Sequence, residues 1–143
     1  MTPDGVEYRA GYVVLCGRSN VGKSTLLNRL VGEKVAIVTP RPQTTRRRIV
    51  GVRTGPDAQL ILVDTPGLHQ ATRLLNRRMV ETARESMAQG DVIAVIIEAG
   101  ERLDAADRAV LEEVRALCRP TVVIINKIDL VPRRRVIPFA QEC

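Results

Sequence analysis

The chain has 143 residues, 45% of them hydrophobic, which suits one domain with a buried core. Its net charge of +6 favours anionic partners such as nucleotides, RNA or anionic lipid. Two Tyr and one Phe are too few for a surface that stacks single-stranded bases, and no apolar run approaches the roughly 20 residues of a membrane span.

The first clear pattern along the chain is the apolar run 12–16, which predicts a strand buried on both faces. It leads into GRSNVGKST (17–25) and a helix expected over about Lys23 to Val31. Glycines let backbone N–H groups wrap phosphates, the lysine can reach the β- and γ-phosphates, and the following serine can bind Mg²⁺. We therefore predict a phosphate-binding loop made of Gly17, Arg18, Ser19, Asn20, Val21, Gly22, Lys23, Ser24 and Thr25.

Residues 46–54 and 58–64 predict two strands joined by the turn signal Gly-Pro-Asp. The second strand ends in DTPGLH (64–69), a weak pattern by itself that gains weight from its place at a strand end after the phosphate loop. Asp64 can hold the shell of a Mg²⁺ ion, and the Gly67 N–H can meet a γ-phosphate. The predicted nucleotide-binding segment comprises Asp64, Thr65, Pro66, Gly67 and Leu68.

The remaining elements continue the alternation of strands and helices. We expect a helix over 73–88, a strand over 91–99, a helix over 105–117 capped by Asp104, and a strand over 121–127. The apolar stripe of the helix over 105–117 is expected to bury Leu103, Ala106, Val110, Val114 and Leu117. Residues 131–143 predict the start of a further helix, whose three consecutive arginines fit a solvated helix start better than an RNA site.

The strand over 121–127 runs into NKID, which predicts a loop that reads a nucleotide base. The Asp129 carboxylate can accept hydrogen bonds from N1–H and the 2-amino group of guanine. Adenine lacks both donors and would leave a buried carboxylate unsatisfied. The predicted base-binding residues are Asn126, Lys127, Ile128 and Asp129.

This order of elements predicts an α/β fold with a mainly parallel sheet flanked by helices. Ligands of such folds bind at the carboxyl ends of the strands, and each of the three motifs lies at such an end. A P-loop ATPase of another class is a competing interpretation, and NKID argues against it.

Residues Tyr12 to Asp129 resemble the translation-factor-type GTPases and, among them, the Era family. The Era-like segments are GRSNVGKSTLLN, RPQTTRRRIVG (41–51), DTPGLH and NKID. Related bacterial ribosome or tRNA GTPases usually carry an acidic residue after the switch Thr-Arg pair, whereas here Arg46 is followed by Arg47. The resemblance implies a P-loop NTPase with a Ras-like G domain that binds GTP or GDP with Mg²⁺ and hydrolyses GTP slowly.

The resemblance also assigns roles around the γ-phosphate. It implies that Thr45, with Thr44 as the alternative, ligates Mg²⁺ together with Ser24 and Asp64. The loop over 33–45 is then expected to be ordered by the γ-phosphate. The run Arg46–Arg48 is interpreted equally well as a phosphate or RNA contact and as a solvated strand edge.

Era proteins assist assembly of the small ribosomal subunit and bind 16S ribosomal RNA largely through a KH domain. Residues 1–143 contain no GXXG loop after the GTPase motifs and stop before the fifth guanine-binding motif. We therefore expect a C-terminally incomplete G domain over 1–143, without its last strand and helix or a KH domain, so that the strand over 121–127 lies at a sheet edge. The alternative is a truncated guanine-nucleotide-binding module with little or no turnover.

The expected location is cytoplasmic, because the first residues lack the basic-then-apolar pattern of a signal peptide and no transmembrane segment is predicted. Peripheral association with the inner face of the cell membrane is left open.

Leu68 raises the question of what positions the attacking water, because its side chain cannot form a hydrogen bond. His69 and Gln70 are weaker candidates for this role. By resemblance to potassium-activated GTPases, Asn20 would help hold a K⁺ ion beside the β- and γ-phosphates, where a cation can replace an arginine finger. We therefore expect catalysis to depend on Asn20, Lys23, Thr45 and the nearby switch backbone.

Overall fold

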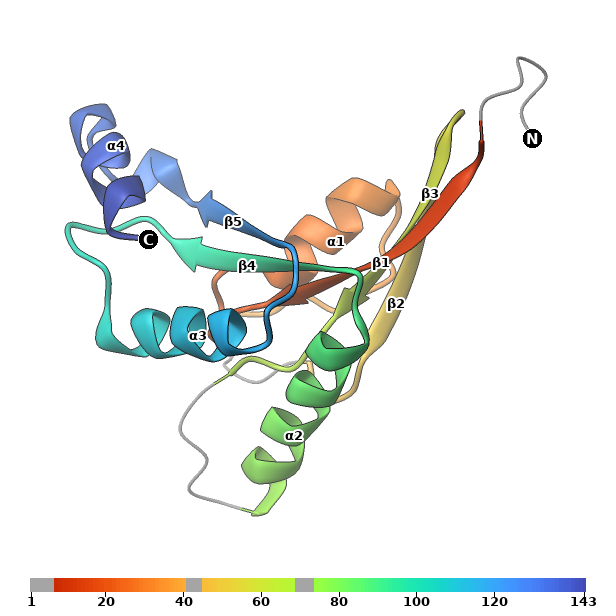
Figure 1. Cartoon of the computed structure of the whole chain (residues 1–143). Coiled ribbons are helices and arrows are strands. Elements are labelled where there is room, and N and C mark those ends of the chain that lie inside the picture. The colour runs from red at the N-terminus through yellow and green to blue at the C-terminus, as the bar shows by residue number, and fades with distance from the viewer. Residues whose placement is uncertain (1–6, 41–44, 69–73) are drawn as a thin grey trace.

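The computed structural model describes residues 7–40, 45–68 and 74–143. Within them, five strands form one sheet in the order β2-β3-β1-β4-β5 (Figure 1). The strands are β1 (Arg9–Cys16), β2 (Ile49–Thr54), β3 (Ala58–Asp64), β4 (Val92–Glu98) and β5 (Thr121–Asn126). Strands β3, β1, β4 and β5 run parallel, and β2 is antiparallel to β3. The expected α/β fold with a mainly parallel sheet is confirmed.

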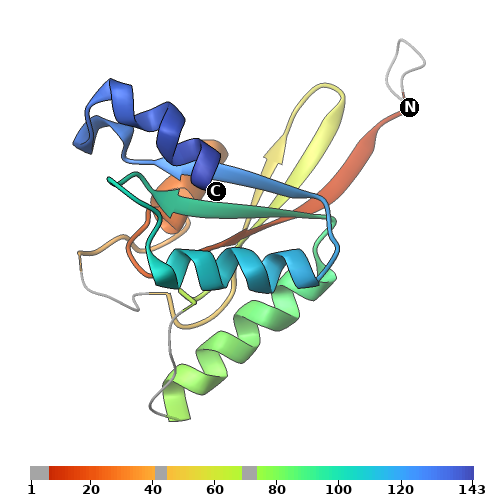
Figure 2. The same ribbon diagram turned by 60° about the vertical axis from the view of Figure 1, so that its left-hand side comes forward.

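Helices lie on both faces of this sheet, with α1 on one face and α2 and α3 on the other (Figures 1 and 2). They are α1 (Lys23–Val31), α2 (Leu74–Gln89), α3 (Ala105–Ala116) and α4 (Arg133–Glu142), and a short 3₁₀ helix, η1, spans Ile128–Leu130. None of the helices in the described parts has the length and hydropathy that a bilayer crossing requires.

The two-sided burial explains the continuous apolar strands. In β1, Val14 and Cys16 pack with α2 and α3, whereas Leu15 packs with α1 on the opposite face. Because successive side chains of a strand point to opposite faces, a strand covered on both sides needs apolar residues at every position. The site therefore sits on a sheet whose centre is fully buried.

Two strands start three residues away from the expected position, while the other strand boundaries agree to within one residue. Strand β1 begins at Arg9, because residues 9–11 continue the ladder with β3 although Arg9 and Ala10 are exposed. Strand β2 begins at Ile49 and not at Arg46, because Ile49 already pairs with Asp64, the last residue of β3. Residues 46–48 thus lie beyond the end of their partner strand.

The helix α3 confirms the predicted cap and corrects one predicted core position. The Asp104 carboxylate accepts a hydrogen bond from the Ala106 N–H at 2.7 Å, as expected for an N-cap. Ala106 is exposed, however, and Asp107 is buried in its place. The predicted helix near the C-terminus is confirmed as α4, with Phe139 buried against the core that also contains Val110.

Candidate functional site

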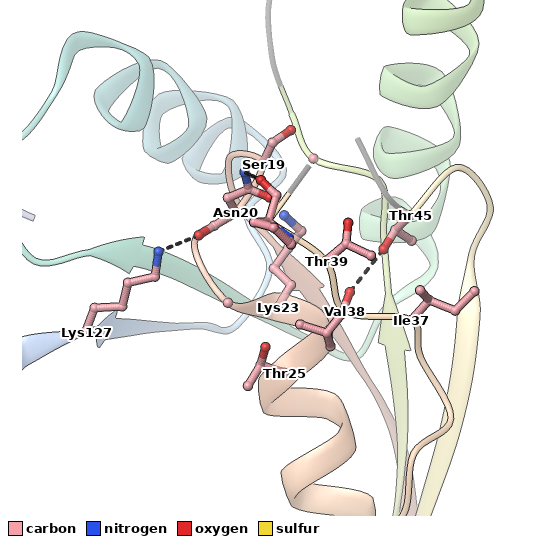
Figure 3. Close-up of a pocket in the computed structure, with 13 residues that line it drawn as sticks. Ser19, Asn20, Lys23, Thr25, Ile37, Val38, Thr39, Thr45 and Lys127 are labelled. Atoms are coloured by element: carbon pink, nitrogen blue, oxygen red, sulfur yellow. Dashed lines mark hydrogen bonds between the residues drawn. The ribbon is translucent and has the colours of Figure 1, made fainter. Parts of the chain in front are cut away.

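The carboxyl ends of β1, β3 and β5 meet around a pocket of about 460 Å³ (Figure 3). Its walls come from the phosphate loop, the chain after α1, and the loops that follow β3 and β5. The lining residues are Ser19, Asn20, Gly22, Lys23, Ser24, Thr25, Ile37, Val38, Thr39, Pro40, Thr45, Gly67 and Lys127. The three predicted motifs therefore converge on one pocket.

Lys23 opens α1 and is buried, with 6% of its surface exposed. Its Nζ donates to the Gly17 carbonyl at 3.2 Å and to the Arg18 carbonyl at 2.6 Å, so the ammonium is held inside the curve of the loop. Burial lowers the pKa of Lys23 to about 8, against the opposing effect of the Asp64 carboxylate. A poorly solvated cation at this point is well suited to bind an anion.

Ser24, Thr45 and Asp64 bring three oxygen groups together. The Ser24 hydroxyl lies 2.5 Å from Asp64 Oδ2 and 3.0 Å from the Thr45 hydroxyl, and the Thr45 hydroxyl lies 3.3 Å from the same carboxylate oxygen. Asp64 is fully buried, and its Oδ1 has no hydrogen-bond partner among the described residues. Burial raises the pKa of Asp64, although the hydrogen bond from Ser24 and the charge of Lys23 pull it down.

This donor set fits a Mg²⁺ ion. Magnesium prefers oxygen ligands and is held by one or two carboxylates or hydroxyls together with phosphate oxygens and water. A buried carboxylate with one unpaired oxygen beside two hydroxyls provides such ligands. Thr44, the alternative to Thr45, lies outside the described residues, so the choice between them stays a prediction.

The segment after β3 is anchored tightly against the phosphate loop. A Cβ atom on Gly67 would lie 2.5 Å from Ser19 Oγ and 2.7 Å from the Ser19 nitrogen, so only glycine fits without a shift. The Leu68 N–H donates to the Gly17 carbonyl at 3.0 Å, and the Leu68 side chain is buried in the core. Thr65 is also buried, and its hydroxyl donates to the Leu15 carbonyl at 2.8 Å.

The side chains of Thr65 and Leu68 therefore hold the loop in place and do not line the pocket. The sequence pattern could not separate this anchoring from nucleotide contact. His69 and Gln70 lie outside the described residues.

The predicted base-reading loop is bonded to the phosphate loop at two points. Asn126 Nδ2 donates to the Val21 carbonyl at 2.9 Å. Lys127 Nζ donates to the Asn20 carbonyl at 2.7 Å, a bond visible in Figure 3. Lys127 has a left-handed backbone with φ of 57° and also pairs with Glu98 at 2.7 Å. Ile128 and Asp129 follow in η1 and are exposed.

The sequence placed the loop over 33–45 near the γ-phosphate but did not single out the pocket wall formed by Ile37, Val38, Thr39 and Pro40. This stretch is held from α1 by the Asn28 side chain, whose Oδ1 accepts from the Val35 and Ala36 N–H groups at 3.0 and 2.8 Å. Asn28 Nδ2 also donates to the Ala36 carbonyl at 2.9 Å. An asparagine inside a helix is a mild signal, because its side chain usually competes for backbone groups.

Two phosphate-loop side chains have unexpected partners. Asn20 Nδ2 donates to the Pro40 carbonyl at 3.2 Å, which links the phosphate loop to the wall after α1. Arg18 does not line the pocket, and its guanidinium pairs instead with Asp107 of α3 and with Asp104, the N-cap of that helix. The backbone of Arg18 still belongs to the loop through its bond with Lys23.

Comparison with known proteins gives a consistent picture. Residues 12–127 match the family model described as 50S ribosome-binding GTPase. The chain is 44% identical over 134 residues to GTPase Era of Syntrophus aciditrophicus (strain SB), an alignment that covers 94% of this chain and 44% of that protein. The chain thus spans less than half the length of this curated relative.

Two solved structures are also similar. The structure of Era in complex with MgGDPNP and nucleotides 1506–1542 of 16S ribosomal RNA aligns with a TM-score of 0.90 at 41% identity, over 95% of this chain and 47% of that one. A variant of Aquifex aeolicus Era bound to GDP·AlF₄⁻ aligns with a TM-score of 0.87 at 41% identity, over 93% of this chain and 46% of that one.

Proposed function

Because this chain belongs to the 50S ribosome-binding GTPase family and carries a G domain of the Era type, we propose that it binds GTP and GDP with Mg²⁺ and hydrolyses GTP slowly as a switch. The observation that carries this proposal is that Lys23, Ser24 and Thr45 line one pocket, with the buried Asp64 carboxylate bonded to the Ser24 and Thr45 hydroxyls and the base-reading loop bonded to the phosphate loop. Similar Era structures hold MgGDPNP and GDP·AlF₄⁻.

Each part of the pocket has a task in this proposal. The Lys23 ammonium neutralises charge on the β- and γ-phosphates, while the N–H groups of the loop orient their oxygens. Ser24, Thr45 and Asp64 would hold Mg²⁺, which supplies further charge neutralisation on the transferred phosphoryl group when bound. The Gly67 backbone lies against Ser19 of the phosphate loop, a position from which it would respond to a γ-phosphate.

Base selection tests the proposal most directly. We expect Asp129→Asn to weaken GTP binding at least about tenfold and to favour xanthine nucleotides, because the carboxylate that pairs with guanine becomes an amide. The measurement is competition of GTP, XTP and ATP against a fluorescent GDP analogue. Asp57→Asn, in the exposed turn between β2 and β3, is the matched control and should keep guanine preference. Unchanged GTP affinity in Asp129→Asn would show that this residue does not read the base.

A phosphate-release assay, run beside the binding assay, separates the enzyme from a nucleotide-binding module without turnover. Phosphate release from GTP supports the switch, whereas tight GTP binding without release supports the module.

We further propose that water activation uses a K⁺ ion held by Asn20. Asn20 lines the pocket, where its Nδ2 donates to the Pro40 carbonyl, and a turn of the amide would bring its oxygen beside that carbonyl to face one cation. Leu68 is buried in the core and contributes no polar group. We expect faster GTP hydrolysis in KCl than in NaCl, and loss of this difference in Asn20→Asp. Equal wild-type rates in the two salts would rule out the K⁺ site.

The role in the cell is proposed from the family alone. By analogy with Era bound to 16S ribosomal RNA, the nucleotide state of this domain would control contact with the small ribosomal subunit during its assembly in the cytoplasm. The test is cosedimentation with small subunits in GTP analogue and in GDP. Peripheral membrane association remains a prediction, testable by flotation with anionic vesicles.

A further inference from the structure

Among the residues that the structure describes, one buried charged side chain lies outside the candidate site. Asp107 is in the first turn of α3, and 4% of its surface is exposed. Lys23 and Asp64 are also buried, but both belong to the site already described. A buried carboxylate destabilises a fold unless a partner compensates its charge. Asp107 therefore needs a partner.

That partner is Arg18 of the phosphate loop, 89 positions away in the sequence. Arg18 Nη1 lies 3.3 Å from Asp107 Oδ2 and 3.1 Å from Asp104 Oδ2, so one guanidinium joins two carboxylates at the start of α3. The N-terminus of a helix favours negative charge, which makes this end of α3 a good place for both carboxylates. Burial raises the pKa of Asp107, and the Arg18 charge opposes this shift.

The end of α3 that holds Arg18 is itself fixed to a neighbouring helix. The Leu103 N–H, just before the Asp104 cap, donates to the Glu142 carboxylate of α4 at 3.0 Å.

The anchored residue is also the one that shapes the loop around Lys23. The Arg18 carbonyl accepts the 2.6 Å hydrogen bond from Lys23 Nζ, and the preceding Gly17 carbonyl accepts from both Lys23 and Leu68. A change at the Arg18 side chain therefore reaches the backbone that would wrap the phosphates.

We propose that Asp107 is a positioning residue for guanine-nucleotide binding, which acts through Arg18 and fixes the phosphate loop without touching the ligand. The inference rests on the proposed function and adds a determinant of affinity on α3, outside the pocket.

The test compares nucleotide affinity in a set of variants of the 143-residue chain. Asp107→Asn keeps the size of the side chain and removes its charge, and Arg18→Gln removes the charge of the partner. Each is expected to weaken binding of a fluorescent GDP analogue roughly tenfold, mainly through faster dissociation. Arg18→Lys, which keeps the charge, should lose less than Arg18→Gln.

The double variant Arg18→Gln/Asp107→Asn distinguishes a coupled pair from two separate effects. It should bind as weakly as the weaker single variant, because the second change removes a partner that is already lost. Glu113→Gln is the matched control, since it breaks an arginine–carboxylate pair of the same helix away from the loop, and its affinity should equal that of wild type.

Kinetics separate positioning from general damage to the fold. In Asp107→Asn, KM for GTP should rise while kcat stays within about twofold, because the reacting groups are unchanged. Unchanged affinity in both single variants, additive losses in the double variant, or an equal loss in Glu113→Gln would overturn the inference alone. Failure of wild type to bind guanine nucleotide would overturn the proposed function, and this inference with it.

Discussion

At the scale of single residues, the phosphate loop contains a charged side chain, Lys23, whose burial disfavours its protonated form. Lys23 is an almost fully buried ammonium whose nearest partners are carbonyl oxygens, and its pKa falls from 10.5 to about 8. Between these two pH values the unfolded chain binds a proton that the folded, nucleotide-free chain does not. Through this residue, the free energy of unfolding therefore rises as pH increases from about 8 towards 10.5.

Bound phosphates should stabilise the protonated form of Lys23, so nucleotide affinity should depend on pH. Phosphates favour the protonated amine, so we expect GDP affinity to fall as pH rises through about 8 and binding at pH 8.5 to take up a proton. Calorimetry in two buffers of different ionisation enthalpy measures that uptake, and at pH 6.5 it should vanish for Lys23. Affinity that stays constant from pH 7 to 9 would contradict the prediction.

Single residues also show what apolar spacing in the sequence could not predict. Apolar spacing placed Ala106 on the buried side of α3, whereas the structure buries the neighbouring Asp107. The reason is the ion pair with Arg18, a contact between distant segments that no local period contains. Leu68 is a related case, because its apolar side chain is explained by the core beneath it.

At the scale of elements, α1 carries the phosphate loop and also holds the wall that faces it. The Asn28 side chain makes three hydrogen bonds to the backbone of residues 35–36. Ala36 is buried against α1 in the same core cluster as Leu27. The stretch that leads to Pro40 is thus tied to the helix, one turn beyond Ser24.

Removal of this tie should loosen the wall selectively. We expect Asn28→Ala to increase trypsin cleavage after the exposed Lys34 about tenfold, since the hydrogen bonds that order this backbone are lost. Asn28→Asp keeps the acceptor of two of the three bonds and should give an intermediate rate. Cleavage within α3 serves as the internal reference. Equal cleavage after Lys34 in all three proteins would show that other contacts order the wall.

The alternation of strands and helices could be predicted from the sequence, because the buried strands are short apolar runs and the helices have apolar stripes. The start of β2 could not be predicted, because Arg46, Arg47 and Arg48 have no feature that distinguishes them from edge-strand residues. Their place outside the ladder depends on where β3 ends.

At the scale of the whole molecule, the pocket joins segments from most of the chain. Three hydrogen bonds connect the elements around it. Asn126 at the end of β5 bonds to Val21 of the phosphate loop, Ser24 bonds to Asp64 at the end of β3, and Asn28 of α1 bonds to Ala36. The sequence predicted which motifs meet, because parallel strands end on one side of the sheet. It did not predict the side-chain bonds that join them.

Such a pocket should couple ligand binding to global stability. At a GDP concentration about 100 times Kd, with Mg²⁺, binding adds about 2.7 kcal/mol to the free energy of unfolding, which corresponds to a rise in Tm of roughly 8 °C. Differential scanning fluorimetry measures the shift, with ADP at the same concentration as the control. An equal rise with ADP would contradict guanine selectivity.

The bonds between the base-reading loop and the phosphate loop also bear on how the protein is made. Asn126 contacts Val21 across 105 positions of sequence. At the usual pace of translation, the second partner leaves the ribosome roughly 5 to 20 s after the first. Throughout that interval the phosphate loop of each new chain lacks its bonds to β5, so under the proposed function the newborn protein would select guanine only after β5 has been synthesised and added to the sheet.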